Sequence, residues 1–312
     1  MELKPSENTK LYGMNHFFNE ISILYNEKKL PTKILLSGKR GLGKSTLAYH
    51  IINYILSTGE EFKYDSKNFI INENNRSFKL LQNNSHPNFY LIDLLNDKKI
   101  IDVAQIRKMI EYTNKSTFNN MARFILIDNI ENLNKNSVNA LLKVIEEPNE
   151  NVFFILINNS EKNMLPTLRS RCLIFKINLT FNESINISNQ ILDKNIFGII
   201  NHDLINFYNT PGEIINLINF SNNKNIDLKN YTLINFLNLL IDNGYYKKNK
   251  IVKILIINFI ELFFLKEYKL SKTKNSLLSF YHIFINKIHN TEKFNLDEES
   301  LFLEFKSKLL NG

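Results

Sequence analysis

The stretch GKRGLGKS, at residues 38–45, has the residue types and the spacing of a loop that binds phosphate groups. It fits the pattern G-x-x-x-x-G-K-[ST] in full, follows an apolar run and opens a helical one, which is the context such loops require. Its three glycines allow a tight turn whose N–H groups converge on phosphate oxygens. Lys44 can reach the β and γ phosphates, and the Ser45 hydroxyl can ligate magnesium. The predicted nucleotide-binding residues here are Gly38, Gly41, Gly43, Lys44, Ser45 and Thr46.

An acidic position with a related role ends the apolar run FILID at residues 124–128. We predict that Asp128 lies opposite Ser45 and completes the environment of a magnesium ion. The next residue is Asn129, whereas enzymes of this kind that hydrolyse nucleotide normally carry a glutamate there. A neutral amide can orient a water molecule but cannot take its proton, and Glu131 lies two residues further on in an expected loop. The pattern therefore predicts nucleotide binding without efficient hydrolysis.

Five short apolar runs in the first half of the chain are expected to be the strands that position these residues. They are continuously apolar rather than alternating, which is typical of strands buried on both faces of a parallel sheet. Helical patterns separate several of them, and this alternation predicts a doubly wound α/β domain over residues 1–177. Residues 59–85 are polar and poorly periodic, so we predict an irregular or mobile insertion there. The runs are KILLS (33–37), FYLID (89–93), FILID (124–128), VFFILIN (152–158) and LIFKI (173–177).

The second half of the chain has no convincing strand pattern. Residues 178–222 are predicted to form short helices joined by Asn-rich turns, and residues 223–312 a separate all-helical domain. The most apolar run, ILIINFIELFFL at 254–265, contains Glu261 and is too short to span a bilayer. We therefore predict that it is a buried helix.

Composition is typical of a soluble globular protein, with 44% hydrophobic and 22% charged residues among 312. The formal charge of +8 would suit a phosphate-bearing partner. The chain is also rich in Asn, Ile and Lys, however, and their A/T-rich codons produce basicity without such a partner. Cys172 is the single cysteine, which excludes an internal disulfide and a four-thiolate zinc site. MELKPSENTK lacks the apolar stretch of a signal peptide, so a reducing cytoplasm is the expected compartment, without membrane attachment.

A longer stretch, NSVNALLKVIEEPNENVFFILINNSEKNMLPTLRSRC at residues 136–172, resembles the signature region of clamp-loader AAA+ subunits. The specific parts are NALLKVIEEP and the final Ser170-Arg171-Cys172. Together with SHPNFYLID at residues 85–93 and the departure after Asp128, they most resemble the delta-prime subunits of bacterial DNA polymerase III. The resemblance covers the α/β domain strongly, residues 178–222 weakly, and the C-terminal helices in size and character.

This resemblance implies an AAA+ P-loop domain (1–177), a small helical lid (178–222) and an all-α C-terminal collar (223–312). It implies a five-subunit ring, with tau/gamma-like and delta-like subunits, that opens a sliding clamp and places it on primed DNA in the bacterial cytoplasm. ATP or ADP with Mg²⁺ would be the cofactor, and the chain would be a component of the polymerase holoenzyme. Arg171 would act in trans as a finger in a neighbouring nucleotide site, where a guanidinium neutralises charge on the transferred phosphoryl group. Cys172 is expected to pack in the core.

Three departures separate the chain from the motor subunits of that family. Asn129 replaces the hydrolytic glutamate, Asn159 stands where a threonine usually senses the γ-phosphate, and Gly212 stands where motors carry a sensor arginine. Asn159 could still hydrogen-bond the phosphate, so we include it among the nucleotide-binding residues. Many delta-prime subunits also carry a zinc module near residues 59–85, and a single cysteine excludes that module here.

The preferred interpretation is thus an interaction subunit that binds nucleotide, has weak or no ATPase activity of its own, and supplies Arg171 to a neighbour. The alternative is an ATP-hydrolysing motor of the tau/gamma kind or another DNA-associated AAA+ ATPase. A small-molecule P-loop kinase would explain the phosphate loop but none of residues 136–172.

Overall fold

The computed structural model describes residues 4–95, 98–115, 121–159, 166–247, 250–270, 274–294 and 296–310 of the chain. Two compact units are present, one formed by residues 1–191 with 210–212 and the other by residues 192–209 with 213–312. The first contains a β-sheet, and the described part of the second contains helices only. The division of residues 178–222 and 223–312 into a lid and a collar stays a prediction.

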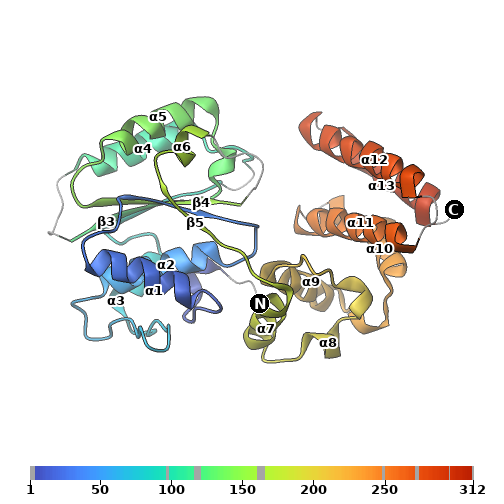
Figure 1. Cartoon of the computed structure of the whole chain (residues 1–312), viewed down its shortest axis with the longest axis horizontal. Helices are drawn as coiled ribbons and strands as arrows, with labels where there is room; N and C mark the ends of the chain where they lie inside the picture. Colours follow the sequence, from blue (N-terminus) through green and yellow to red (C-terminus); the bar gives the residue numbers. More distant parts are fainter. Residues whose placement is uncertain are drawn as a thin grey trace. The chain divides into compact units, whose positions relative to one another are not determined.

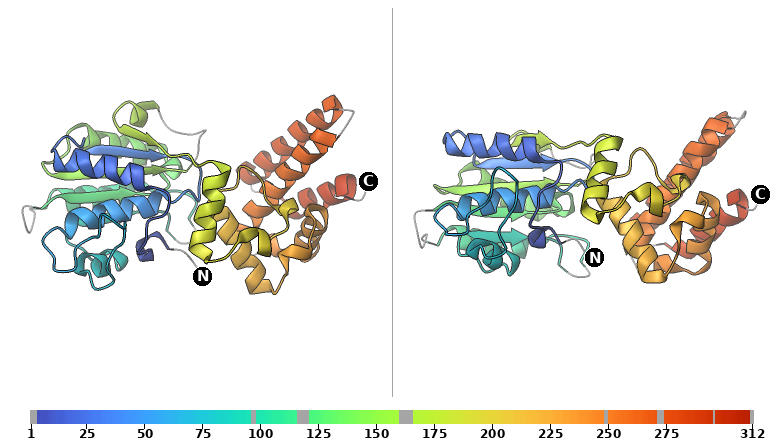
Figure 2. Two further views of the ribbon diagram at one scale, coloured as in Figure 1. Left: turned by 60° about the horizontal axis from the view of Figure 1, so that its bottom comes forward. Right: turned by 90° about the horizontal axis from the view of Figure 1, so that it is seen from below.

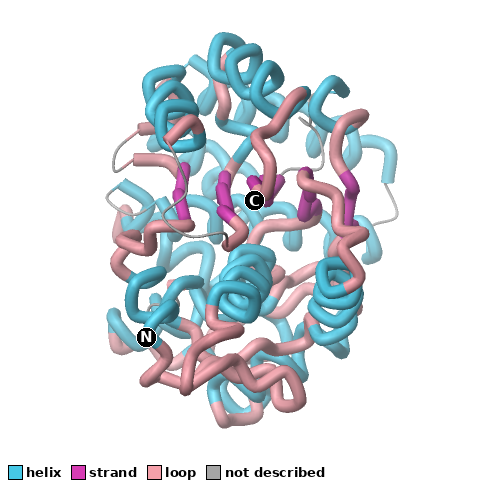
Figure 3. Tube along the Cα trace, turned by 90° about the vertical axis from the view of Figure 1, so that its left-hand side faces the viewer, coloured by secondary structure: helices cyan, strands magenta, loops and turns pink. Residues whose placement is uncertain are grey.

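A five-stranded sheet forms the centre of the first unit (Figure 1). Its strand order is β2-β3-β4-β1-β5. Neighbouring strands all pair in parallel, and Figure 3 shows them side by side in one layer. Every apolar run predicted to be a strand is one, and the predicted α/β class with a parallel sheet is confirmed. The strands are β1 (Lys33–Ser37), β2 (Phe89–Ile92), β3 (Arg123–Ile127), β4 (Val152–Asn158) and β5 (Leu173–Lys176).

Helices cover both faces of this sheet, α1 to α3 on one face and α4 and α5 on the other (Figure 1). Successive strand residues point to opposite faces. Ile34 and Leu36 of β1 therefore join the core beneath α1 and α2, while Leu35 joins the core beneath α4 and α5. Burial on both faces explains why the strand sequences are continuously apolar. The helices are α1 (Asn15–Asn26), α2 (Lys44–Leu56), α3 (Arg76–Gln82), α4 (Val103–Thr113), α5 (Lys135–Glu146), α6 (Pro166–Arg169) and α7 (Phe181–Leu192).

Residues 59–85 are more regular than predicted. They include α3, and the side chains of Tyr64 and Phe78 are buried in the core of the first unit. The Glu60 carboxylate accepts hydrogen bonds from the backbone N–H groups of Arg76 and Ser77, at 2.9 and 3.0 Å, and so caps this helix. The prediction of an irregular insertion was therefore wrong for α3. Its N-cap, Asn75, accepts a hydrogen bond from the Phe78 N–H at 2.6 Å and was a local signal for this helix.

His86 packs against the same helix and has a structural role. Its Nδ1 accepts a hydrogen bond from the backbone N–H of Asn88 at 3.1 Å, so Nε2 carries the proton and faces the Ser77 hydroxyl at 3.3 Å. This is the reverse of what a serine nucleophile needs from a base. Nowhere in the described ranges are three or more His, Cys, Asp or Glu residues placed to hold a metal ion.

The second unit packs its helices around buried aromatic side chains, of which Phe236, Phe302 and Phe305 are almost fully enclosed. Figure 2 shows the long helices α11 and α12 running beside each other. The apolar run at residues 254–265 lies within α11, and its residue Phe259 is buried, as predicted. None of the helices described is long and apolar enough to cross a membrane. The helices are α8 (Ile196–Ile199), α9 (Pro211–Lys224), α10 (Leu233–Asp242), α11 (Lys250–Leu270), α12 (Lys274–Phe294) and α13 (Glu298–Phe305).

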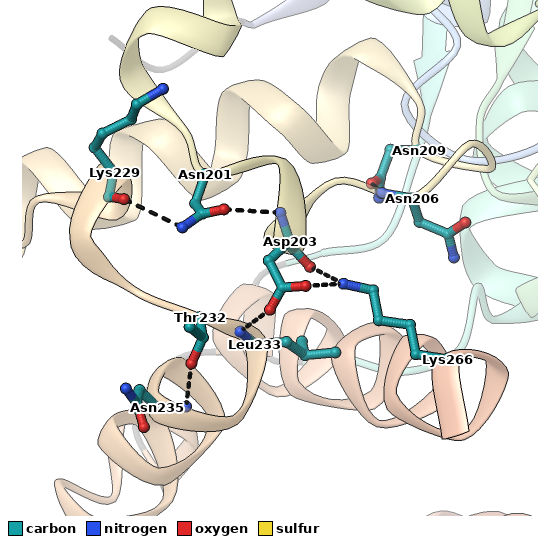
Figure 4. Close-up of polar contacts among 9 residues, drawn as sticks. All are labelled: Asn201, Asp203, Asn206, Asn209, Lys229, Thr232, Leu233, Asn235 and Lys266. Atoms are coloured by element: carbon teal, nitrogen blue, oxygen red, sulfur yellow. Dashed lines mark hydrogen bonds and ion pairs between the residues drawn. The ribbon is translucent and has the colours of Figure 1, made fainter. Parts of the chain in front are cut away.

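Asp203 shows why residues 192–209 group with the C-terminal helices (Figure 4). Its carboxylate accepts a hydrogen bond from the N–H of Leu233, at the start of α10, at 2.6 Å, and pairs with Lys266 of α11. Asn201 accepts from the Asp203 N–H at 3.0 Å and donates to the backbone oxygen of Lys229 at 3.2 Å. Although burial acts to raise it, the pKa of Asp203 is lowered overall by the hydrogen bonds from Leu233 and Lys266. One carboxylate thus joins three segments.

Candidate functional site

The carboxyl ends of β1, β3 and β4 bring the predicted nucleotide-binding residues to one edge of the sheet, where β2 also ends. β1 leads into the phosphate loop, residues 38–45, and the loop leads into α2. β2 is followed by Asp93, β3 by Asp128 and β4 by Asn159. Because the strands are parallel, their ends point the same way, and this edge is where open α/β sheets bind ligands.

The phosphate loop uses backbone conformations and contacts that favour glycine. Gly41 and Gly43 have φ angles of +84° and +90°, which L side chains rarely adopt. A Cβ added at Gly38 would lie 2.2 Å from the backbone oxygen of Ile177, so the loop begins in direct contact with the chain beyond β5. The N-terminus of α2 adds the positive end of its helix dipole. The loop therefore has the shape and the polarity to hold an anion.

Lys44 is buried at this edge, with 2% of its surface exposed. Its ammonium group donates to the backbone oxygens of Gly38 at 2.8 Å and Lys39 at 2.6 Å. Burial lowers the pKa of Lys44 to about 8, and the negative charges of Asp128 and Glu131 oppose this shift. Because burial disfavours the ammonium, a bound phosphate group would stabilise its charged form strongly.

Ser45 and Asp128 are in direct contact. The Ser45 hydroxyl donates to Asp128 Oδ2 at 2.5 Å, and the Asn159 amide donates to Oδ1 of the same carboxylate at 3.1 Å. Hydroxyl and carboxylate oxygens are ligands that Mg²⁺ prefers, usually completed by water and substrate phosphates. Thr46, the next residue of α2, accepts a hydrogen bond from the Asn8 side chain at 3.4 Å. The structure thus brings Ser45, Asp128 and Asn159 together, and their binding of nucleotide and Mg²⁺ stays a prediction.

Asn129 is held between neighbouring strand ends. Its φ of +56° lies in the left-handed region, which Asn adopts more readily than Glu. Its side-chain amide donates to Asp93 Oδ1 at 2.7 Å, and its side-chain oxygen accepts from Asn159 at 3.0 Å. Where a water-activating carboxylate is expected, the site therefore has an amide whose donor and acceptor are both engaged.

Asp93 is a residue of this site that the sequence analysis missed. Burial raises its pKa, and the nearby charge of Asp128 raises it further. FYLID ends in Asp93 just as FILID ends in Asp128, and this shared ending was an available signal. Glu131, expected in a loop, is half-buried and accepts a hydrogen bond from the Asn159 backbone N–H at 3.1 Å.

Arg171 has its polar contacts on α5 and α6 rather than at the phosphate loop. Its guanidinium lies 2.8 Å (Nη2) and 3.1 Å (Nε) from Glu146 Oε1 and donates from Nη1 to the backbone oxygen of Thr167 at 3.0 Å. The side chains of Arg171 and Glu146 are 37% and 51% exposed. Such an exposed pair contributes only about 0–1 kcal/mol, so the guanidinium can exchange partners at small cost. Burial raises the pKa of Cys172 to about 11, so this half-buried thiol is not a nucleophile at neutral pH.

Comparisons with known proteins relate the chain to subunits of DNA polymerase III. Residues 13–180, more than half of the chain, match the family model described as DNA polymerase III, delta subunit. The chain is 32% identical over 171 residues to the DNA polymerase III subunit delta' of Buchnera aphidicola, covering 54% of this chain and 50% of that one. It is 33% identical over 194 residues to subunit gamma of the same species, covering 61% and 50%. The chain thus spans about half the length of the curated relatives it matches.

Among solved structures, a DNA polymerase III gamma subunit-related protein from Thermotoga maritima superposes on the chain with a TM-score of 0.46. The two are 15% identical, and the alignment covers 92% of this chain and 96% of that one.

Proposed function

The chain belongs to the DNA polymerase III delta-subunit family, and we propose that it acts as a delta-prime-like subunit of the replicative clamp loader. In this proposal it binds ATP or ADP with Mg²⁺ at its phosphate loop and hydrolyses the nucleotide poorly. Its partners would be tau/gamma-like and delta-like subunits in a five-subunit ring that places a sliding clamp on primed DNA. It would supply Arg171 to the nucleotide site of a neighbouring subunit.

The hydrogen bond between Asn129 and Asp93 is the observation that carries the proposal. A general base must be free to take a proton from the attacking water. Asn129, which follows Asp128 directly, cannot take one, and its hydrogen bond to Asp93 Oδ1 at 2.7 Å holds the amide in that position. The site therefore supports binding better than turnover.

The residues present fit a magnesium nucleotide. Lys44 and the N–H groups of the phosphate loop would hold the phosphates, while Ser45 and Asp128 would hold the metal ion. A magnesium ion held by these residues would neutralise charge on the phosphate groups. Asn159 orients Asp128 through a hydrogen bond to Oδ1. In this arrangement the chain's own residues bind and orient the nucleotide.

The exposed position of Arg171 supports a role in trans. A guanidinium that stabilises charge on another subunit's phosphoryl group must reach beyond its own surface, and such a finger increases the rate by about 10³–10⁵. Its partner Glu146 is about half exposed, and the pair is therefore weak enough to open.

Two measurements test the proposal. Calorimetry should show that the wild-type chain binds ADP with Mg²⁺ and that Lys44→Ala does not. In a complex reconstituted with its partner subunits, Arg171→Ala should depress ATPase activity, and Arg171→Lys should not restore it because an ammonium lacks the planar fork. Equal activity of the Arg171→Ala and wild-type complexes would refute the role in trans.

A second function, that of an ATP-hydrolysing motor, is favoured by the complete phosphate loop and by the 33% identity to a gamma subunit. Turnover by the purified chain distinguishes the two proposals. A rate above about 1 s⁻¹, within the ordinary range of enzymes, would favour the motor.

A further inference from the structure

Residues Thr210–Gly212 join the first unit through a direct contact between two backbones. The N–H of Gly212 donates to the backbone oxygen of Gly41, in the phosphate loop, at 3.0 Å. Thr210 is 2% exposed, so the segment is packed as well as hydrogen-bonded. These three residues group with residues 1–191 in one compact unit. A segment far along the sequence thus contacts the loop that is proposed to bind phosphate.

The close approach depends on glycine at position 212. A Cβ added at Gly212 would lie 2.7 Å from the Cα of Gly41 and 3.1 Å from its oxygen. Real Cβ atoms essentially never come within 3.0 Å of another atom in this way, and the atom opposite is backbone, which cannot rotate aside. Gly41 has no side chain either. The two glycines together make the contact possible.

This hydrogen bond orients one peptide group of the phosphate loop. The oxygen of Gly41 and the N–H of Leu42 belong to the same planar trans peptide and point in opposite directions. While Gly212 holds the oxygen on one side, the Leu42 N–H is directed to the other. The Leu42 side chain is 7% exposed, so packing restrains the same peptide group from its other end. N–H groups in this part of a phosphate loop are the ones that bind phosphate oxygens.

We infer that Gly212 is a positioning residue for nucleotide binding, whose backbone N–H keeps the Leu42 N–H turned toward the phosphate oxygens. The inference rests on the proposed nucleotide binding at the phosphate loop. Because the contact favours binding, bound nucleotide must favour the contact by the same factor. This reciprocity gives a measurement that requires no substitution.

Gly212→Ala and Gly198→Ala form a matched pair of variants. Each places alanine at a glycine within a helix, but a Cβ at Gly198 meets no atom within 4 Å. Calorimetry measures the Kd for ADP with Mg²⁺, and NMR measures hydrogen exchange of the backbone amides. We expect Gly212→Ala to raise this Kd about three- to tenfold, the effect of one hydrogen bond, and to speed exchange at Leu42. Gly198→Ala should change neither quantity.

In the wild-type chain, the Gly212 amide should be protected from exchange, and ADP should increase this protection. This second measurement decides the question even where Gly212→Ala does not fold. Wild-type ADP affinity in a folded Gly212→Ala chain, or protection of Gly212 that ADP leaves unchanged, would overturn the positioning role alone. A wild-type chain that binds no ADP would refute the proposed nucleotide binding and the positioning role together.

Discussion

We expect Asn129→Glu, which places a carboxylate after Asp128, to destabilise the chain unless Asp93 is also substituted. The Asn129 amide donates to Asp93 Oδ1 at 2.7 Å, so Asn129→Glu replaces a hydrogen-bond donor by a second carboxylate beside a half-buried one. The new side chain must also adopt the φ of +56° found at this position. That conformation costs an L residue about 1–2 kcal/mol. Charge and conformation thus both oppose the substitution.

The expected magnitude follows from the geometry. Two unit charges 4 Å apart repel by about 4 kcal/mol at an effective dielectric constant of 20. One of the two carboxyl groups can relieve this repulsion by taking up a proton, which costs about 1.4 kcal/mol for each unit by which the pH exceeds its pKa. This cost is reduced at Asp93, because its pKa is already raised. We expect Asn129→Glu to lower the free energy of unfolding by about 2–4 kcal/mol at neutral pH. Since one folded-state pKa of the pair is raised, the loss should shrink as the pH falls.

Urea unfolding of a small set of variants measures this effect. Asn129→Gln is the matched control, because Gln has the size and the backbone strain of Glu without its charge. The double variant Asp93→Asn/Asn129→Glu exchanges the amide and the carboxylate, so the hydrogen bond can form again with reversed roles. With Asp93→Asn alone, these variants complete a double-mutant cycle. The double variant should recover most of the stability lost in Asn129→Glu and should hydrolyse ATP faster than either single variant.

Two results would refute this reasoning. Equal stability of Asn129→Glu and Asn129→Gln would show that the charge of Asp93 does not act on position 129. Additive effects of the Asp93 and Asn129 substitutions would show that the two residues are energetically independent despite the short hydrogen bond.

Three further predictions concern charged residues. The affinity for ADP should fall up to about tenfold per pH unit above pH 8, because Lys44 loses its proton near that pH in the free chain. An affinity that calorimetry finds unchanged above pH 8 would contradict this. Glu146→Gln should change the free energy of unfolding by less than about 1 kcal/mol, because its ion pair with Arg171 is exposed. It should also release Arg171 and raise the ATPase activity of a reconstituted complex up to about fivefold. The same increase in the control Glu147→Gln would argue against a specific pair. Asp203→Asn should lower the free energy of unfolding by about 1 kcal/mol at neutral pH. Because the pKa of Asp203 is lowered in the folded chain, the wild type loses this contribution as the pH falls through that pKa. Urea unfolding should therefore give wild type and Asp203→Asn similar free energies of unfolding in acid.

Local sequence patterns predicted much of the first unit. Continuous apolar runs reveal buried parallel strands because both faces of each strand need apolar residues. The phosphate loop was recognisable because its glycines, lysine and serine are neighbours in the chain. The contact between Ser45 and Asp128 could be predicted from the same pattern, since the loop and a strand-end acid occur together in such sites.

Other features were not predictable in this way. The partner of Asn129 is Asp93 only because β2 lies beside β3 in the sheet, and no local pattern states which strands are neighbours. Glu60 caps α3 from well before the helix, in addition to the local N-cap Asn75, and no local pattern indicates this second cap. The contact of Gly212 with Gly41 depends on two glycines far apart in the sequence.

The sequence by itself determined which segments are strands, which loop is shaped for phosphate, and that the residue after Asp128 cannot act as a base. Only the tertiary structure decided what that residue binds, that Glu131 is drawn into the site, and which backbone contacts Gly41. The physical reason is the separation along the sequence of the residues that interact. Strand burial and turn geometry are set by neighbouring residues, whereas hydrogen bonds between strand ends depend on the order and register in which the whole sheet packs.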